Sequence, residues 1–140
     1  MLGNIIDIGA IHVVIKAAVE TYNLKSIGLD GNNAREFGTD LTAKGFQVDE
    51  IGQQATHLNE AMRKLLELCT AGRMLHGDDS MLKWCVGNMV AKTTNGLVRP
   101  DKENSTEKID PAVAMVMAVR QCLFGDDPTK QSRIRVVNVG

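Results

Sequence analysis

The dipeptide Asn95-Gly96 constrains the fold of this chain more than any other short stretch of its sequence. A type I′ turn requires positive φ at both central residues, and asparagine followed by glycine meets this requirement well. We therefore expect a β-hairpin that turns at Asn95-Gly96. The hairpin and its flanks carry three basic residues, Lys92, Arg99 and Lys102.

A buried helix is expected shortly after the hairpin. Asp110 suits the N-cap position, where its carboxylate accepts free N–H groups, and Pro111 suits the first helical position. Residues 112–119 are all apolar, so this helix should be buried nearly all round. The pattern places a carboxylate at the start of a buried helix, directly after a basic hairpin.

The first third of the chain predicts alternating helices and strands. The expected order is a helix over residues 9–22, a strand over 25–29, a helix from Asn32 or Asn33 to Lys44, and a strand over 46–51. This alternation requires parallel crossovers and is typical of an α/β sheet. Asp30 directly follows the first strand, and such sheets usually place their sites at the carboxyl ends of parallel strands.

The middle of the chain predicts two further helices. An amphipathic helix over residues 59–69 should turn four apolar side chains inward, namely Met62, Leu65, Leu66 and Cys69. A short strand over residues 73–76 is expected next, and then a helix capped by Asp79 or Ser80 and ending near Gly87. We expect Trp84 to anchor the core rather than to stack against a base.

Composition narrows the possible classes of protein. The 140 residues are 44% apolar and 24% charged, which suits one globular domain with a real core. The net charge of −1 means that any surface for nucleic acid must be local. No apolar run is long enough to cross a membrane. The three cysteines, Cys69, Cys85 and Cys122, form no CxxC pair, so we expect buried thiols in a reducing cytoplasm rather than a zinc site or disulfides.

Several short runs share their order and spacing with a known family. The runs are Asn88-Met89-Val90-Ala91-Lys92, Asn95-Gly96, Pro100-Asp101-Lys102 and Lys108-Ile109-Asp110. Together they resemble the end of the nuclease domain in large terminase subunits of tailed bacteriophages. The preceding Leu75-His76-Gly77-Asp78-Asp79 and Leu82-Lys83-Trp84 are similar to the His-Gly and Leu-Arg-Trp segments of that family. The resemblance covers roughly residues 4–121 and is densest over 75–118.

The resemblance implies a ribonuclease H-like α/β fold in an incomplete form. The antiparallel strands that open such a sheet are missing, which leaves a mixed sheet, flanking helices and the hairpin before the last helix. We expect residues 1–125 to form the partial nuclease domain. Residues 126–140 are expected to be a C-terminal tail, within which 133–139 favour a strand.

The resemblance also implies an activity, a site and partners. Members of the family are two-metal endonucleases that cut double-stranded DNA during genome packaging. Asp30 and Asp110 fall where those nucleases have metal-binding aspartates, and hard cations such as Mg²⁺ or Mn²⁺ prefer carboxylate oxygens. Lys92, Arg99 and Lys102 are then expected to contact DNA phosphates. The implied protein partners are the terminase small subunit and the portal, in the cytoplasm of a bacterial host.

Each of these assignments has a plainer interpretation. Asp30-Gly31 is a common pair between a strand and a turn, and Asp110-Pro111 is a common helix start. The run from His76 to Asp79 contains three possible metal ligands, but consecutive side chains rarely converge and Asp79 suits a helix cap. The spacing of these residues in the sequence is therefore also compatible with a purely structural role for each of them.

The sequence also departs from the pattern of the family. Relatives usually have Asp-Pro-Trp-Asn-Ala-Thr where this chain has Asp30-Gly31-Asn32-Asn33-Ala34-Arg35, and Pro111 replaces a usual glycine. The first catalytic aspartate of the family belongs to a strand upstream of Met1, and no GxxxxGK[ST] loop of a packaging ATPase occurs. Asp7 is the one early acid that could substitute, although a solvated turn residue is the plainer interpretation.

Two hypotheses follow from these departures. The first is part of a metal-dependent endonuclease, weak or inactive as this chain. The alternative is a catalytically silent α/β remnant that acts as a binding or assembly module. In either case an unpaired sheet edge favours self-association.

Overall fold

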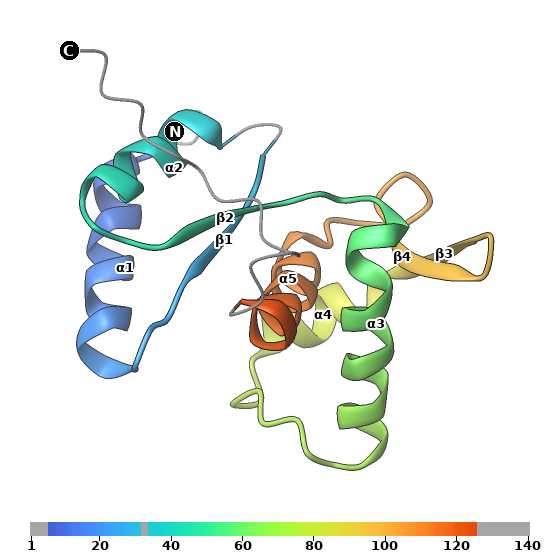
Figure 1. The fold of residues 1–140 in the computed structure, drawn as a ribbon. Coiled ribbons are helices and arrows are strands. Elements are labelled where there is room, and N and C mark those ends of the chain that lie inside the picture. The colour runs from blue at the N-terminus through green and yellow to red at the C-terminus, as the bar shows by residue number, and fades with distance from the viewer. Residues whose placement is uncertain (1–5, 32–33, 126–140) are drawn as a thin grey trace.

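The computed structural model describes residues 6–31 and 34–125, which form five helices and four strands (Figure 1). In chain order they are α1 (Ile8–Thr21), β1 (Ile27–Asp30), α2 (Arg35–Ala43), β2 (Val48–Ile51), α3 (Ala55–Thr70), α4 (Ser80–Asn88), β3 (Val90–Thr94), β4 (Leu97–Asp101) and α5 (Asp110–Phe124). The predicted tail over residues 126–140 lies outside the described residues.

β1 and β2 form the predicted parallel pair, with α2 as the crossover between them. The register pairs Ile27 with Val48 and Asp30 with Ile51, so Asp30 is the last residue of β1. The predicted helix cap is wrong, because the N-cap position of α2 is Ala34, whereas Asn32 and Asn33 lie outside the described residues. The predicted stop is confirmed: Gly45 has φ +91° directly after the C-cap.

β3 and β4 form the predicted antiparallel hairpin. Asn95 and Gly96 have φ values of 51° and 76°, as the turn requires. Thr94 pairs with Leu97 next to the turn, and Lys92 pairs with Arg99 further along. Within the described residues the hairpin and the β1–β2 pair are two separate two-stranded sheets.

The core lies between α3, α5 and the β1–β2 pair, and Figure 1 shows α5 running between the strands and α3. Its buried side chains are Ile51, Leu58, Ala61, Leu65 and Val116. The predicted inward face of α3 was therefore only partly right. Leu65 is buried, but Leu66 is 69% exposed and Cys69 is exposed. Leu58, Ala61 and Leu65 define the buried stripe, because one residue along a helix rotates the side chain by about 100°.

α5 also departs from prediction in two ways. Its N-cap position is Ile109, so Asp110 occupies the first helical position and Pro111 the second. The helix is buried along one face, whose members are Ala112, Val113, Val116 and Arg120, while Ala114 and Ala118 are exposed. Alanine counts as apolar in the sequence pattern, but its small side chain is readily left exposed to solvent on the outer face of a helix.

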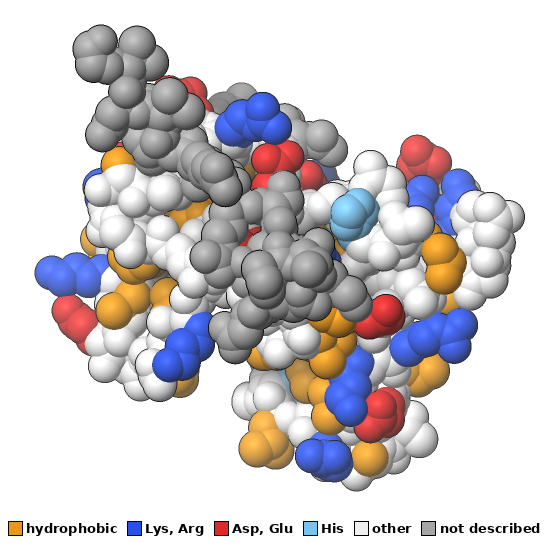
Figure 2. Space-filling view, in the orientation of Figure 1, with side chains coloured by type: hydrophobic (Ala, Val, Ile, Leu, Met, Phe, Trp, Pro, Cys, Tyr) orange, Lys and Arg blue, Asp and Glu red, His pale blue; other side chains and the backbone are white. Residues whose placement is uncertain are grey.

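The segment from α3 to the hairpin contains further differences. Residues 73–76 form no strand in the described chain, but Asp79 caps α4 as predicted by accepting from the Leu82 N–H at 2.7 Å. Trp84 is 48% exposed, so its predicted core role is wrong, and Cys85 fills the buried position of α4 instead. Cys122, like Cys69, is exposed rather than buried. Figure 2 shows hydrophobic side chains at the surface around the C-terminal end of α3.

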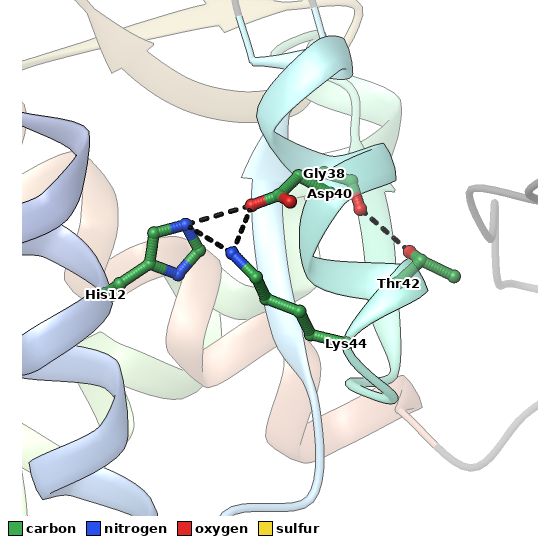
Figure 3. Close-up of polar contacts among 5 residues, drawn as sticks. All are labelled: His12, Gly38, Asp40, Thr42 and Lys44. Atoms are coloured by element: carbon green, nitrogen blue, oxygen red, sulfur yellow. Dashed lines mark hydrogen bonds and ion pairs between the residues drawn. The ribbon is translucent and has the colours of Figure 1, made fainter.

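In the described residues, α1 contacts α2 through a polar cluster of His12, Asp40 and Lys44 (Figure 3). His12 Nε2 lies 2.9 Å from Asp40 Oδ2, and Lys44 Nζ lies 2.8 Å from the same oxygen. The Lys44 ammonium, more than His12, holds the pKa of the Asp40 carboxyl below its usual range. The His12 ring also contacts Phe37 at 5.3 Å between centroids. Asp7, the early acid of the sequence, caps α1 by accepting from the Ala10 N–H at 3.2 Å.

None of the helices in the described part of the chain is long and apolar enough to span a membrane. Basic and acidic side chains are interspersed on the face drawn in Figure 2, in keeping with the small net charge. Any preference for a charged ligand therefore depends on local geometry.

Candidate functional site

A groove of 740 Å³ lies where the carboxyl ends of β1 and β2 face the hairpin. Asp30, Lys92 and Arg99 line it, so the structure brings together three of the five predicted site residues. We call this the Asp30 groove. Its other lining residues are Gly31, Glu50, Ile51, Gly52, Gln53, Gln54, Ala55, Thr56, Thr94, Asn95 and Leu97.

The strand ends build one wall of the Asp30 groove. Asp30 ends β1, and Glu50 is the penultimate residue of the neighbouring β2. The Glu50 carboxylate accepts from Arg35 Nη2 at 3.3 and 3.4 Å and lies over Gly31. A Cβ at residue 31 would overlap the Glu50 side chain, so a larger residue there would require that side chain to move.

The hairpin builds the opposite wall. Lys92 and Arg99 are direct cross-strand partners, which places both side chains on the same face of the hairpin. Like charges directly opposite each other destabilise a strand pair. A bound anion between the two cations would remove that repulsion. This wall of the groove is therefore suited to a phosphate group.

Asp110 lies at the start of α5, and Lys102 directly follows β4. Lys102 Nζ is 3.2 Å from Asp110 Oδ1, and the two side chains are 49% and 67% exposed. Neither residue is among those that line the Asp30 groove. Lys102, a predicted phosphate contact, is thus paired in the structure with Asp110, a predicted metal ligand.

The direction of α5 relates Asp110 to the strand ends. Gln121 Nε2 donates to Ser26 Oγ at 3.0 Å, just before β1, and to the buried Asp49 of β2 at 2.7 Å. Four residues earlier, Met117 Sδ lies 3.6 Å from Gln53, just beyond β2. α5 therefore runs antiparallel to the strands, with Asp110 about 10 Å beyond Met117. This is the direction that an Asp30–Asp110 pair needs, although the pair itself stays a prediction.

Sequence reasoning missed Glu50 and the loop that follows β2. The signal was available, because Glu50 lies at the carboxyl end of the second parallel strand, where the rule applied to Asp30 holds equally. The loop residues Gln53, Gln54 and Thr56 carried no comparable signal. Their place in the groove depends on where the hairpin packs, which local sequence does not determine.

A metal ion would find the right donor chemistry in the Asp30 groove but too few donors. Asp30 and Glu50 offer carboxylate oxygens, which Mg²⁺ and Mn²⁺ prefer. Over residues 6–31 and 34–125, however, no group of three or more His, Cys, Asp or Glu side chains is placed to hold a metal ion. The described carboxylates thus fit a metal centre only in part. The run from His76 to Asp79 does not form one either, since Asp79 is engaged in capping α4.

Comparison with known proteins relates this arrangement to a family. A family model described as "Terminase large subunit, endonuclease domain" matches residues 2–126. The chain is 32% identical over 123 residues to Protein YmfN of Escherichia coli K12, covering 85% of this chain and 27% of that protein. It is 30% identical over 120 residues to the terminase large subunit of Enterobacteria phage HK97, covering 84% of this chain and 24% of that protein.

A solved structure shares the fold. The crystal structure of the HK97 bacteriophage large terminase matches with a TM-score of 0.73 at 30% identity, covering 82% of this chain and 25% of that one. The match confirms the predicted ribonuclease H-like α/β class. The chain spans about a quarter of the length of these relatives. It belongs to the family of terminase large subunit endonuclease domains.

Proposed function

We propose that this chain is the DNA-facing part of a terminase nuclease that works in phage genome packaging. Lys92 and Arg99 bind phosphates of double-stranded DNA across the Asp30 groove, and Lys102 adds a contact nearby. Asp30 and Asp110 contribute oxygen ligands to a metal-dependent site for cutting the DNA. As in the family, the metal is Mg²⁺ or Mn²⁺.

One observation carries the proposal. Two cations stand directly opposite each other on the hairpin and line the same groove as the carboxylate that ends β1. Opposed cations attract an anion, and they do so here although Asp101, on the same face of the hairpin, already interacts with Lys92. A carboxylate at a strand end suits a cation. A phosphodiester that is bound against a metal ion satisfies both requirements at once.

Efficient cleavage is not expected from this chain by itself. Two-metal hydrolysis requires several carboxylates around the ions, and the described residues gather no group of three possible ligands. If a metal pair were bound, with Asp30 and Asp110 among its ligands, it would supply the activation of water and the stabilisation of the leaving oxygen. The contribution of this chain is to hold the DNA backbone on the hairpin wall and to present Asp30 at the strand ends.

A cleavage assay tests this proposal. The full chain is incubated with supercoiled plasmid and Mn²⁺, with Asp30→Asn and Asp110→Asn as controls for contaminating nuclease. We expect slow or no nicking, together with weak Mn²⁺ binding that either variant reduces. Robust cleavage abolished by Asp110→Asn would show a complete site and overturn the claim of missing ligands. Mn²⁺ binding that is equal in all three proteins would overturn the role of both aspartates.

A role in assembly is the second candidate function, and the β1–β2 pair favours it. In the described chain β1 is hydrogen-bonded to β2 as its one neighbouring strand, so a further strand could add to its other edge. A second groove, of 470 Å³, lies between residues preceding and within β1 and the outer face of α5, and includes Leu24, Gly28, Ala114 and Ala118. We propose that this edge pairs with a second copy of the chain.

Sedimentation velocity over a concentration series checks the assembly role. We expect a shift to larger species as the concentration rises through the micromolar range. A single monomeric species at every concentration would contradict self-association. Family membership further suggests the terminase small subunit and the portal as partners of the packaging machine, in the cytoplasm of a bacterial host.

A further inference from the structure

Two residues of α3 bind the hairpin turn and the start of β4. Asn59 Oδ1 accepts from the Val98 N–H at 3.0 Å. Arg63, one helical turn further along, donates from Nη2 to the Gly96 carbonyl at 3.3 Å. Arg63 Nε also donates to Asn59 Oδ1 at 3.2 Å, which links the two contacts. We call Asn59 and Arg63 the α3 clamp.

The α3 clamp satisfies a backbone group that the hairpin leaves free. Thr94 and Leu97 flank a two-residue turn and form a hydrogen-bonded pair, so the next pair, Thr93 and Val98, is not hydrogen-bonded. The Val98 N–H therefore points away from β3. The next outward-facing position of β4 is Pro100, which has no N–H. Asn59 thus binds the one outward-facing N–H of β4 between the turn and Pro100.

The α3 clamp matters for the Asp30 groove because the two walls of the groove, the β3–β4 hairpin and the β1–β2 pair, are not hydrogen-bonded to each other as strands in the described chain. Within the described residues, no ladder joins β3–β4 to β1–β2. A two-stranded hairpin is only marginally stable by itself, so its position must come from packing and from contacts such as these. Figure 1 shows the hairpin beside the N-terminal half of α3, where α3 and β4 are in contact.

We propose that Asn59, supported by Arg63, is the positioning residue that sets the distance between the basic pair and Asp30. Arg99 directly follows Val98 and faces Lys92, so anchoring Val98 fixes both cations over the groove. The role in DNA binding rests on the proposed function. The clamp itself is a property of the free protein and is testable without DNA.

The first experiment measures amide hydrogen exchange in the full chain. Asn59→Ala should speed exchange at Val98 by about five- to tenfold, because the amide loses its partner. Asn59→Asp keeps an acceptor oxygen at the same place and should preserve the protection. Lys64→Ala is the matched control on the same helix, since Lys64 pairs with Glu67 at 2.9 Å and does not line the groove.

The second experiment measures duplex DNA affinity against salt concentration. Asn59→Ala removes no charge, so it should weaken binding severalfold while the slope of log affinity against log salt stays unchanged. Lys92→Ala should instead reduce that slope by about 1, because a phosphate contact is lost. Lys64→Ala should change neither quantity.

Each outcome decides one part of the inference. Unchanged exchange at Val98 in Asn59→Ala would overturn the clamp. Faster exchange with wild-type DNA affinity would leave the clamp intact and overturn its role in positioning the cations. A wild-type chain that does not bind duplex DNA would refute the proposed function and, with it, the positioning role, whereas exchange at Val98 would still decide whether the clamp exists.

Discussion

Asp110 occupies the first position of α5, where a carboxylate is favoured whether or not it binds a metal ion. The positive end of the helix dipole stabilises an acidic side chain by about 0.3–1 kcal/mol. The exposed ion pair with Lys102 adds about 0–1 kcal/mol. Both terms are small, so a structural role alone would not make this aspartate indispensable to folding.

Asp110→Asn should therefore fold like the wild type. We expect the free energy of unfolding, measured by urea denaturation, to fall by no more than about 1 kcal/mol. This makes the variant a valid control for cleavage and metal binding. A loss above about 3 kcal/mol would show that Asp110 is mainly structural and would undermine its use in both assays.

Asp101 ends β4 and is nearly completely buried, at 3% exposure. Its carboxylate accepts from Asn104 Nδ2 at 2.7 Å, from the Asn104 N–H at 3.3 Å and from the Glu103 N–H at 3.2 Å. The Asn104 side chain, ahead of the backbone donors, holds the pKa of Asp101 below its usual range. These bonds close the base of the hairpin.

The direction of this shift predicts a pH dependence. Because the folded-state pKa of Asp101 is below its unfolded value of about 4, the carboxylate stabilises the fold above that pH. The contribution is lost as the pH falls through the folded-state pKa. In a carboxyl titration followed by NMR, Asn104→Ala should raise the pKa of Asp101, while Asp40 serves as an internal control. An unchanged Asp101 value would contradict the assigned cause.

At the scale of elements, local signals predicted best where a few neighbouring residues decide the conformation. Asn95-Gly96 and Gly45 adopt positive φ as expected, and Asp79 caps α4. The buried face of α3 was only partly right because two overlapping sets of apolar residues, Leu58-Ala61-Leu65 and Met62-Leu65-Leu66-Cys69, could each form a stripe. Only packing against α5 selects between such sets, and local sequence does not contain that information.

In the candidate site, too, local sequence does not determine which elements pack together. Asp30 was predictable because the carboxyl ends of parallel strands are a general location for sites. The place of Gln53 and Gln54 in the groove was not, because it depends on the docking of the hairpin on α3. That docking uses the Asn59–Val98 hydrogen bond between residues 39 positions apart.

The corrected face of α3 makes a direct prediction about stability. Leu58 is 1% exposed and belongs to the core, whereas Leu66 on the same helix is 69% exposed. Leu58→Ala should lower the free energy of unfolding by about 2–5 kcal/mol, and Leu66→Ala by less than about 0.5 kcal/mol. Urea denaturation of both variants checks this. Similar losses in the two would mean that the buried stripe is misassigned.

At the scale of the whole molecule, the chain has the fold of its family and, in its described part, an open edge at β1. It matches the HK97 large terminase over 82% of its own length, which is about a quarter of that protein. β1 pairs on one side in the described chain, and the carboxylates gathered at the strand ends are fewer than a complete metal centre needs. These two features underlie our proposals that this chain associates with a second copy and that it does not cut DNA efficiently by itself.

The salt dependence of duplex DNA binding tests the role of the basic hairpin most directly. Replacing Lys92, Arg99 and Lys102 together by alanine should lower the slope of log affinity against log salt by about 3. A matched triple variant, Lys16→Ala, Lys64→Ala and Lys83→Ala, removes the same charge on the helices α1, α3 and α4, away from the hairpin and the Asp30 groove, and should keep the wild-type slope. Equal slopes in the two triple variants, or binding that ignores salt, would contradict phosphate recognition by the hairpin.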